Sequence, residues 1–64
     1  MAYRENLAKA RKAKGLTQKE AARLIGVSEF TWRAWELGVR TPSLQNAQKV
    51  AELLEQPIEV LFPA

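Results

Sequence analysis

The sequence predicts an all-α fold, a compact arrangement of five short helices. Apolar side chains recur at helical spacing along most of the chain, whereas the alternation of period two that marks a β-strand never persists beyond a few residues. Three isolated glycines, Gly15, Gly26 and Gly38, separate segments that begin with residues suited to capping a helix. Because the chain has 64 residues, we expect residues 1–64 to form one domain.

The first helix is expected over about residues 3–14, where Leu7, Ala10 and Arg11 recur at helical spacing. Gly15 should end it, because the residue that follows a helix often has a positive φ, which glycine adopts without steric cost. The glycine therefore predicts a break before the next helix.

The second helix begins with a strong local start signal. The Thr17 hydroxyl can accept the Glu20 backbone N–H, and the Glu20 carboxylate can accept the Thr17 backbone N–H, which together make a capping box. Gly26 should break this helix after about two turns and adopt a positive φ. We expect its buried side to consist of Ala21, Leu24 and Ile25, and Ala22 to lie where it crosses the next helix.

Three more helices complete the predicted fold. Ser28 should cap a helix over about residues 29–37, and Gly38 should end it. Ser43 should cap a fourth helix, and Pro57 suits the first turn of a short fifth one. The apolar residues expected to face the core are Leu44, Ala47, Val50, Ala51 and Leu54 in the fourth helix, and Ile58, Leu61 and Phe62 in the fifth.

The charge of the chain is unevenly distributed. Residues 1–33 carry eight lysines and arginines against three glutamates, a net charge of +5, whereas residues 34–64 carry two against four, a net charge of −2. A protein with one phosphate-facing side would show this asymmetry, and so would an ordinary solvated surface. The charge alone therefore leaves both interpretations open.

The composition argues against an enzyme, a metal site and a membrane protein. The chain lacks Cys, His and Asp, and its two serines, Ser28 and Ser43, stand at expected helix caps without a neighbouring base. No metal-ligand pattern or phosphate-binding glycine loop is present, so we expect no cofactor and no small-molecule substrate. Because no apolar run approaches the roughly 20 residues that span a bilayer and no signal-peptide core is present, we expect a soluble, unprocessed protein. The lack of cysteine is compatible with any compartment, so the cytoplasmic location that we expect is inferred from function.

An ordered set of motifs covers nearly the whole chain: Arg11 to Gly15 ahead of Leu16-Thr17-Gln18, then Ala22, Gly26-Val27-Ser28, Trp35-Glu36 with Gly38, Pro42-Ser43-Leu44 and the tail Ile58 to Phe62. This set resembles the Cro/XRE-type helix-turn-helix domains, the five-helix lambda-repressor-like class of phage, mobile-element and bacterial regulators. The resemblance implies a sequence-specific, double-stranded-DNA-binding transcriptional regulator, expected to be a repressor. The helix-turn-helix would consist of the second and third helices, with the third helix in the major groove.

The resemblance also implies an ion pair, because this class commonly joins an arginine of the first helix to the glutamate near the loop glycine. The matching positions are Arg11 and Glu36. We expect a mainly structural role for Arg11, since removing one partner of a buried pair leaves the other charge without compensation.

Gln18 is the leading candidate for a phosphate contact. The resemblance places a phosphate-binding glutamine here, at the start of a helix whose free N–H groups also attract anions. Further candidates for contacts to phosphate are Thr17, Lys19, Arg23, Ser28, Arg40 and Thr41.

The third helix is expected to read bases. Trp32 and Trp35 are three residues apart and should face the core together. The side that remains for contact with a partner is expected to present Glu29, Phe30, Arg33, Ala34 and Leu37.

Each base-reading candidate has a chemical partner in the major groove. Arg33 can donate to guanine O6 and N7, and Glu29 can accept from cytosine N4. Phe30 or Ala34 can pack against the methyl group of thymine. The helix offers no Asn or Gln for adenine, so its face is unusually apolar for a base-reading helix.

Two questions stay open at this stage. Phe30, Ala34 and Leu37 also make an apolar stripe, so a protein-interaction module of antitoxin-like or anti-repressor-like type is the alternative to DNA binding. Domains of this class usually bind inverted half-sites as dimers, which form either in solution or only on DNA. The residues expected to form a homodimer contact are Ile58, Val60, Leu61 and Phe62.

Overall fold

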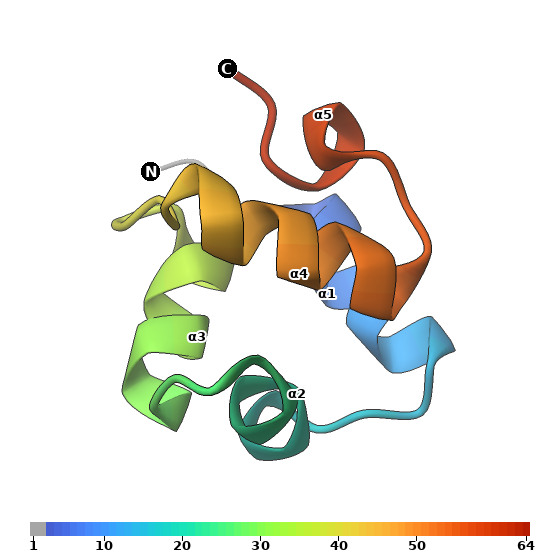
Figure 1. Ribbon diagram of the computed structural model, residues 1–64, viewed down its shortest axis with the longest axis vertical. Coiled ribbons are helices and arrows are strands. Elements are labelled where there is room, and N and C mark those ends of the chain that lie inside the picture. Colours follow the sequence, from blue (N-terminus) through green and yellow to red (C-terminus); the bar gives the residue numbers. More distant parts are fainter. Residues whose placement is uncertain (1–2) are drawn as a thin grey trace.

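The computed structural model describes residues 3–64, which form five helices and no strand in that range, as predicted (Figure 1). In Figure 1, α4 crosses the middle of the molecule in front of α1, α3 runs along one side, and α2 and α5 lie at opposite ends. None of the helices described is long and apolar enough to cross a membrane. The bounds are α1 Glu5–Ala13, α2 Gln18–Ile25, α3 Glu29–Leu37, α4 Leu44–Leu54 and α5 Ile58–Leu61.

Local signals set the starts of three helices. At α2 the capping box is complete: Glu20 N–H donates to Thr17 Oγ1 at 3.0 Å, and Thr17 N–H donates to Glu20 Oε1 at 2.8 Å. The Ser28 hydroxyl accepts the Thr31 N–H at the start of α3, and the Ser43 hydroxyl performs the same role in α4. Each cap satisfies an N–H group that has no partner within its own helix.

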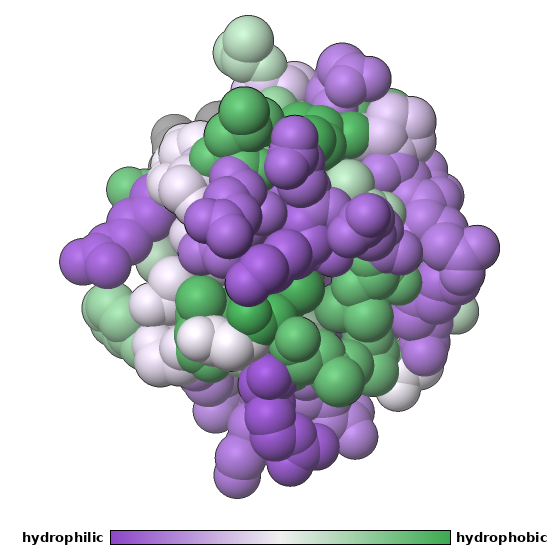
Figure 2. Space-filling model, viewed as in Figure 1, coloured by the Kyte–Doolittle hydropathy of each residue, from purple (hydrophilic) through white to green (hydrophobic). Residues whose placement is uncertain are grey.

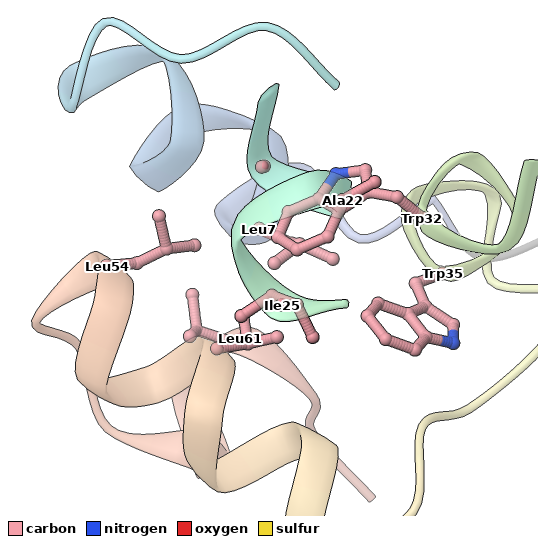
Figure 3. Packing of buried hydrophobic residues seen from close by; sticks show 9 residues of the cluster. Leu7, Ala22, Ile25, Trp32, Trp35, Leu54 and Leu61 are labelled. Atoms are coloured by element: carbon pink, nitrogen blue, oxygen red, sulfur yellow. The ribbon is translucent and has the colours of Figure 1, made fainter. Parts of the chain in front are cut away.

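The core lies where all five helices meet (Figure 3). Its largest member is Trp32, which is fully buried and stacks at a tilt against Trp35, with ring centroids 5.6 Å apart. Ala22 is 1% exposed and belongs to the core cluster, in a helix that packs chiefly against α3. The buried apolar residues that form this cluster are Leu7, Ala21, Ala22, Ile25, Trp32, Trp35, Val50, Leu54 and Leu61.

Two residues predicted to face the core do not. The buried arc of α2 consists of Ala21, Ala22 and Ile25. Leu24 is 59% exposed, because it lies more than a quarter turn from the centre of this arc. Leu44 is 69% exposed for the same reason, since it stands about a quarter turn from the buried arc of α4. On the face of the molecule seen in Figure 1, hydrophilic residues form a band across the middle, and hydrophobic surface lies below this band (Figure 2).

Gly26 ends α2 with a φ of 94°, as predicted, and its N–H donates to the carbonyl of Ala22. Apart from Gly26 itself and its two neighbours in the chain, no atom lies within 4 Å of the point where a Cβ would stand. A side chain at this position would therefore cost backbone strain and no steric clash.

We expect Gly26→Ala to lower the free energy of unfolding by about 1–2 kcal/mol, and Gly26→Val to lower it further. Gly26→Asn should cost least of the three, because asparagine enters the left-handed region more readily than alanine despite its larger size. Thermal or urea unfolding of the three variants measures this order. A loss that simply followed side-chain volume, with Asn worse than Ala, would contradict the explanation.

Candidate nucleic-acid interface

The Glu36 carboxylate joins three helices. Arg11 donates to it from Nε at 2.6 Å and from Nη2 at 3.2 Å. This bidentate ion pair joins α1 to α3. Gln18 Nε2, at the start of α2, donates at 3.0 Å, and Trp32 Nε1 donates at 2.5 Å from within α3. Arg11 also donates from Nη1 to the carbonyl of Leu16, which fixes the connection between α1 and α2.

The ion pair lies inside the protein, with Arg11 8% and Glu36 7% exposed. Burial by itself raises the pKa of Glu36, but the hydrogen bonds from Arg11, Trp32 and Gln18 and the charge of Arg11 together lower it by more, so the pKa lies below its ordinary value. Glu36 is therefore ionised at neutral pH, with its charge compensated by donors from α1, α2 and α3.

Gln18 thus has a structural contact that the sequence analysis did not anticipate. Its side-chain amide carries two protons, and the bond to Glu36 uses one of them, so one remains for a phosphate oxygen. Trp32 is likewise a missed member of this cluster. Its spacing of four residues from Glu36 on one helix was a signal for that contact, whereas no local signal joins Gln18 to Glu36.

Three of the four base-reading candidates are exposed on α3. Phe30 is 66% exposed. Arg33 forms an ion pair with Glu29, four residues before it on the same helix, with Nη2 3.3 Å from Oε2. Because a glutamate on this face would be repelled by DNA phosphates, its pairing with Arg33 reduces that repulsion. The guanidinium of Arg40 stands over the Phe30 ring, 5.8 Å from its centroid.

The prediction that Ala34 faces outward is wrong. Ala34 is 4% exposed, because the chain after Gly38 turns back on the helix, where the N–H groups of Val39 and Arg40 both donate to the Ala34 carbonyl. Leu37 is only partly exposed. The expected apolar stripe on α3 is therefore reduced to the exposed Phe30 and the partly exposed Leu37, and Ala34 has no surface to offer a thymine methyl.

The phosphate candidates lie on or next to α2, immediately before α3 and in the loop after α3. Six of them are exposed, namely Thr17, Lys19, Arg23, Ser28, Arg40 and Thr41, and Gln18 is half-buried. Gln18, at the start of α2, lies beside Glu36 in the last turn of α3. Ser28 immediately precedes α3, and Arg40 and Thr41 lie in the loop that follows it. The Ser28 hydroxyl already donates to Thr31 Oγ1, so its proton is engaged within the protein.

A helix-turn-helix family model matches residues 7–61 of the chain. The chain belongs to the Cro/C1-type helix-turn-helix family. This is a family of DNA-binding transcriptional regulators. The family predicted from the motifs is confirmed.

Two curated relatives of this helix-turn-helix domain are bacterial or phage proteins. An uncharacterized HTH-type transcriptional regulator, YqaE of Bacillus subtilis (strain 168), is 34% identical over 60 residues, which cover 94% of this chain and 52% of the relative. The cryptic phage CTXphi transcriptional repressor RstR of Vibrio cholerae is 38% identical over 61 residues, which cover 95% of this chain and 54% of that protein. The chain thus spans about half the length of these relatives.

Among solved structures, the helix-turn-helix domain is similar to the restriction-modification controller protein C.AhdI from Aeromonas hydrophila. The TM-score is 0.78 at 36% sequence identity, and the match covers 91% of this chain and 84% of that one. The lambda-repressor-like fold class predicted from the sequence is confirmed.

We expect Arg11→Met and Glu36→Leu each to destabilise the domain by about 3–5 kcal/mol, because each leaves a buried charge without its partner. The double variant should lose much less than the sum of the two, since neither charge then remains. Urea unfolding of the four proteins gives the coupling free energy. Additive losses would show that the two side chains do not act as a pair.

The lowered pKa of Glu36 predicts the pH dependence of stability. A carboxyl group whose pKa is lower in the folded than in the unfolded chain stabilises the fold fully above its unfolded pKa, and this contribution is lost as the pH falls through the folded pKa. The contribution of Glu36 should therefore be complete above its ordinary value of 4.5 and decline below it.

The measurement is the melting temperature of the wild type and of Glu36→Gln between about pH 3 and pH 7. Glu20 and Glu55 also have lowered pKa values, through hydrogen bonds from Thr17 and Lys14, and they affect both proteins alike. The difference between the two curves therefore isolates Glu36 and should narrow at low pH. A constant difference would contradict the assignment.

Proposed function

We propose that this chain binds specific sequences of double-stranded DNA and thereby regulates transcription. The observation that carries the proposal is the arrangement around α3: Glu29, Phe30 and Arg33 are exposed on the helix, and candidate phosphate contacts lie on α2, which packs against it, and in the loop that follows it. A groove about 12 Å wide admits one helix, and the phosphates that border it would meet the flanking groups.

Within this proposal α2 anchors the domain and α3 selects the sequence. Gln18 and the exposed N–H groups at the start of α2 would bind one phosphate, with Lys19 and Arg23 nearby and Arg40 and Thr41 at the far end of α3. Arg33 would read guanine, Glu29 cytosine and Phe30 the methyl group of thymine. Sequence specificity would then rest on three side chains, since Ala34 is buried.

Repression is the mode of regulation we propose, since RstR, a relative 38% identical to this chain, is a phage transcriptional repressor. We place the protein in the cytoplasm, where bacterial DNA lies. The alternative of a protein-interaction module is less well supported, because the apolar stripe it required is interrupted by the buried Ala34 between Phe30 and the partly exposed Leu37.

A dimer on two half-sites completes the proposal, because a single domain of this size buries little surface on DNA. Of the apolar tail residues expected at the dimer contact, Leu61 is fully buried and belongs to the core. Val60 is 39% exposed, and Ile58 and Phe62 are partly exposed. The contact would therefore centre on Val60, and sedimentation with and without operator DNA tests it.

Selection of bound duplexes from a random library should yield an enriched motif with a guanine read by Arg33. We expect Arg33→Ala to weaken binding to that motif by about 1–3 kcal/mol and to relax the preference at this base alone. The matched control is Arg23→Ala, which should weaken binding to all sequences and reduce the log–log salt slope by about 0.9. Binding that is insensitive to salt, with no enriched motif, would favour a protein partner instead.

A further inference from the structure

Arg4, which lies just before α1, contacts the far end of α3 and the loop that follows it. Its Nη1 donates to the carbonyl oxygens of Trp35 and Arg40, both at 2.7 Å, and its Nη2 donates to Thr41 Oγ1 at 2.9 Å. Its backbone N–H donates to the carbonyl of Glu36 at 2.8 Å. One residue thus binds four acceptors that are more than 30 positions away in the sequence.

These contacts bring a positive charge and hydrogen-bond donors to the carbonyl end of α3. The last carbonyls of a helix lack partners within it and form the negative end of its dipole, which a cation stabilises. The last turn of α3 contains no basic residue. Arg4 supplies that cation from the beginning of the chain.

The Arg4 side chain is itself held in place from the other side. Its guanidinium lies 5.4 Å from the centroid of the Phe62 ring, and Phe62 meets Trp35 edge to face at 6.4 Å. The N-terminal segment, the loop after α3 and the C-terminal tail therefore converge on this guanidinium. Arg4 is only partly exposed there.

The contacts leave the donor groups of the loop available for a phosphate. Arg4 binds Arg40 through its backbone carbonyl, so the Arg40 guanidinium remains on the side of Phe30. Arg4 binds Thr41 through a lone pair of the hydroxyl oxygen, so the hydroxyl proton remains for another acceptor. Both loop residues are thus fixed by their acceptors and present their donors.

We propose that Arg4 is a positioning residue for DNA binding, which fixes the loop of residues 38–43 so that Arg40 and Thr41 meet a phosphate at the far end of α3. It acts through the loop and needs no contact of its own with DNA. This inference rests on the proposed function, but its structural half, the fixing of the loop, is testable on the free protein.

The first experiment measures loop order without DNA. Arg4→Gln should speed hydrogen exchange at the amides of Val39 and Arg40, which donate to Ala34, by about tenfold, with smaller effects in α2. Lys9→Gln removes the same charge from the exposed side of α1 and should leave these amides unchanged. Arg4→Lys keeps the charge but lacks the planar fork, so it should behave like Arg4→Gln. Unchanged exchange in Arg4→Gln, or full rescue by lysine, would overturn the proposal.

The second experiment measures DNA affinity below the melting temperatures of all variants. Arg4→Gln should weaken binding to the selected duplex by about tenfold, the scale of one charge-assisted hydrogen bond, and reduce the salt slope by about 0.9. In a background of Arg40→Gln and Thr41→Val, the same change should have almost no further effect, since its targets are already gone. A full tenfold loss in that background would show that Arg4 acts elsewhere and would overturn the proposal.

The two experiments separate failure of this inference from failure of the proposed function. If the wild type binds no duplex at low salt, DNA binding is wrong and the role of Arg4 in DNA binding falls with it, whatever the exchange data show. If the wild type binds DNA and Arg4→Gln binds equally well, only the positioning role is wrong.

Discussion

The buried carboxylate of Glu36 is the constraint on which the arrangement of the first three helices depends. A charge removed from water is costly unless it is paired and fully hydrogen-bonded, and here the donors come from Arg11 in α1, Gln18 in α2 and Trp32 in α3. Apolar packing between helices tolerates small sliding movements, whereas hydrogen bonds of about 3 Å do not. The relative orientation of the helix-turn-helix is therefore set by a polar contact within an otherwise apolar core.

The same contact links the core to the candidate DNA-binding surface. Gln18 is both a donor to Glu36 and the first residue of α2, where an anion would bind, so the anchor and the structural cluster share one side chain. On α3, Trp32 and Trp35 face the core, and Glu29, Phe30 and Arg33 face outward. Arg4 and Gln18 both bind the last turn of α3: Arg4 donates to the carbonyls of Trp35 and Glu36, and Gln18 donates to the Glu36 side chain.

The local features of the fold were predictable from the sequence, since each depends on residues close together in the chain. Helix caps depend on contacts between residues three apart, as at Thr17 with Glu20, Ser28 and Ser43. Gly26 adopts a left-handed backbone conformation that few other residue types reach without strain. The errors at Leu24, Ala34 and Leu44 have a different origin. Helical spacing shows which residues share a face, but the direction of the neighbouring helix or loop decides how far the buried arc extends.

By itself, then, the sequence determined the number of helices, their ends and the family, because caps, glycines and apolar periodicity act within a few residues. Tertiary structure alone decided that Ala34 is buried on α3, that Gln18 donates to Glu36 and where Arg4 binds. Arg4 and Thr41 are 37 positions apart, and Gln18 and Glu36 are 18 apart, so no local pattern marks either contact. Such contacts exist only after the helices have packed, since packing is what brings a donor and a distant acceptor to within 3 Å.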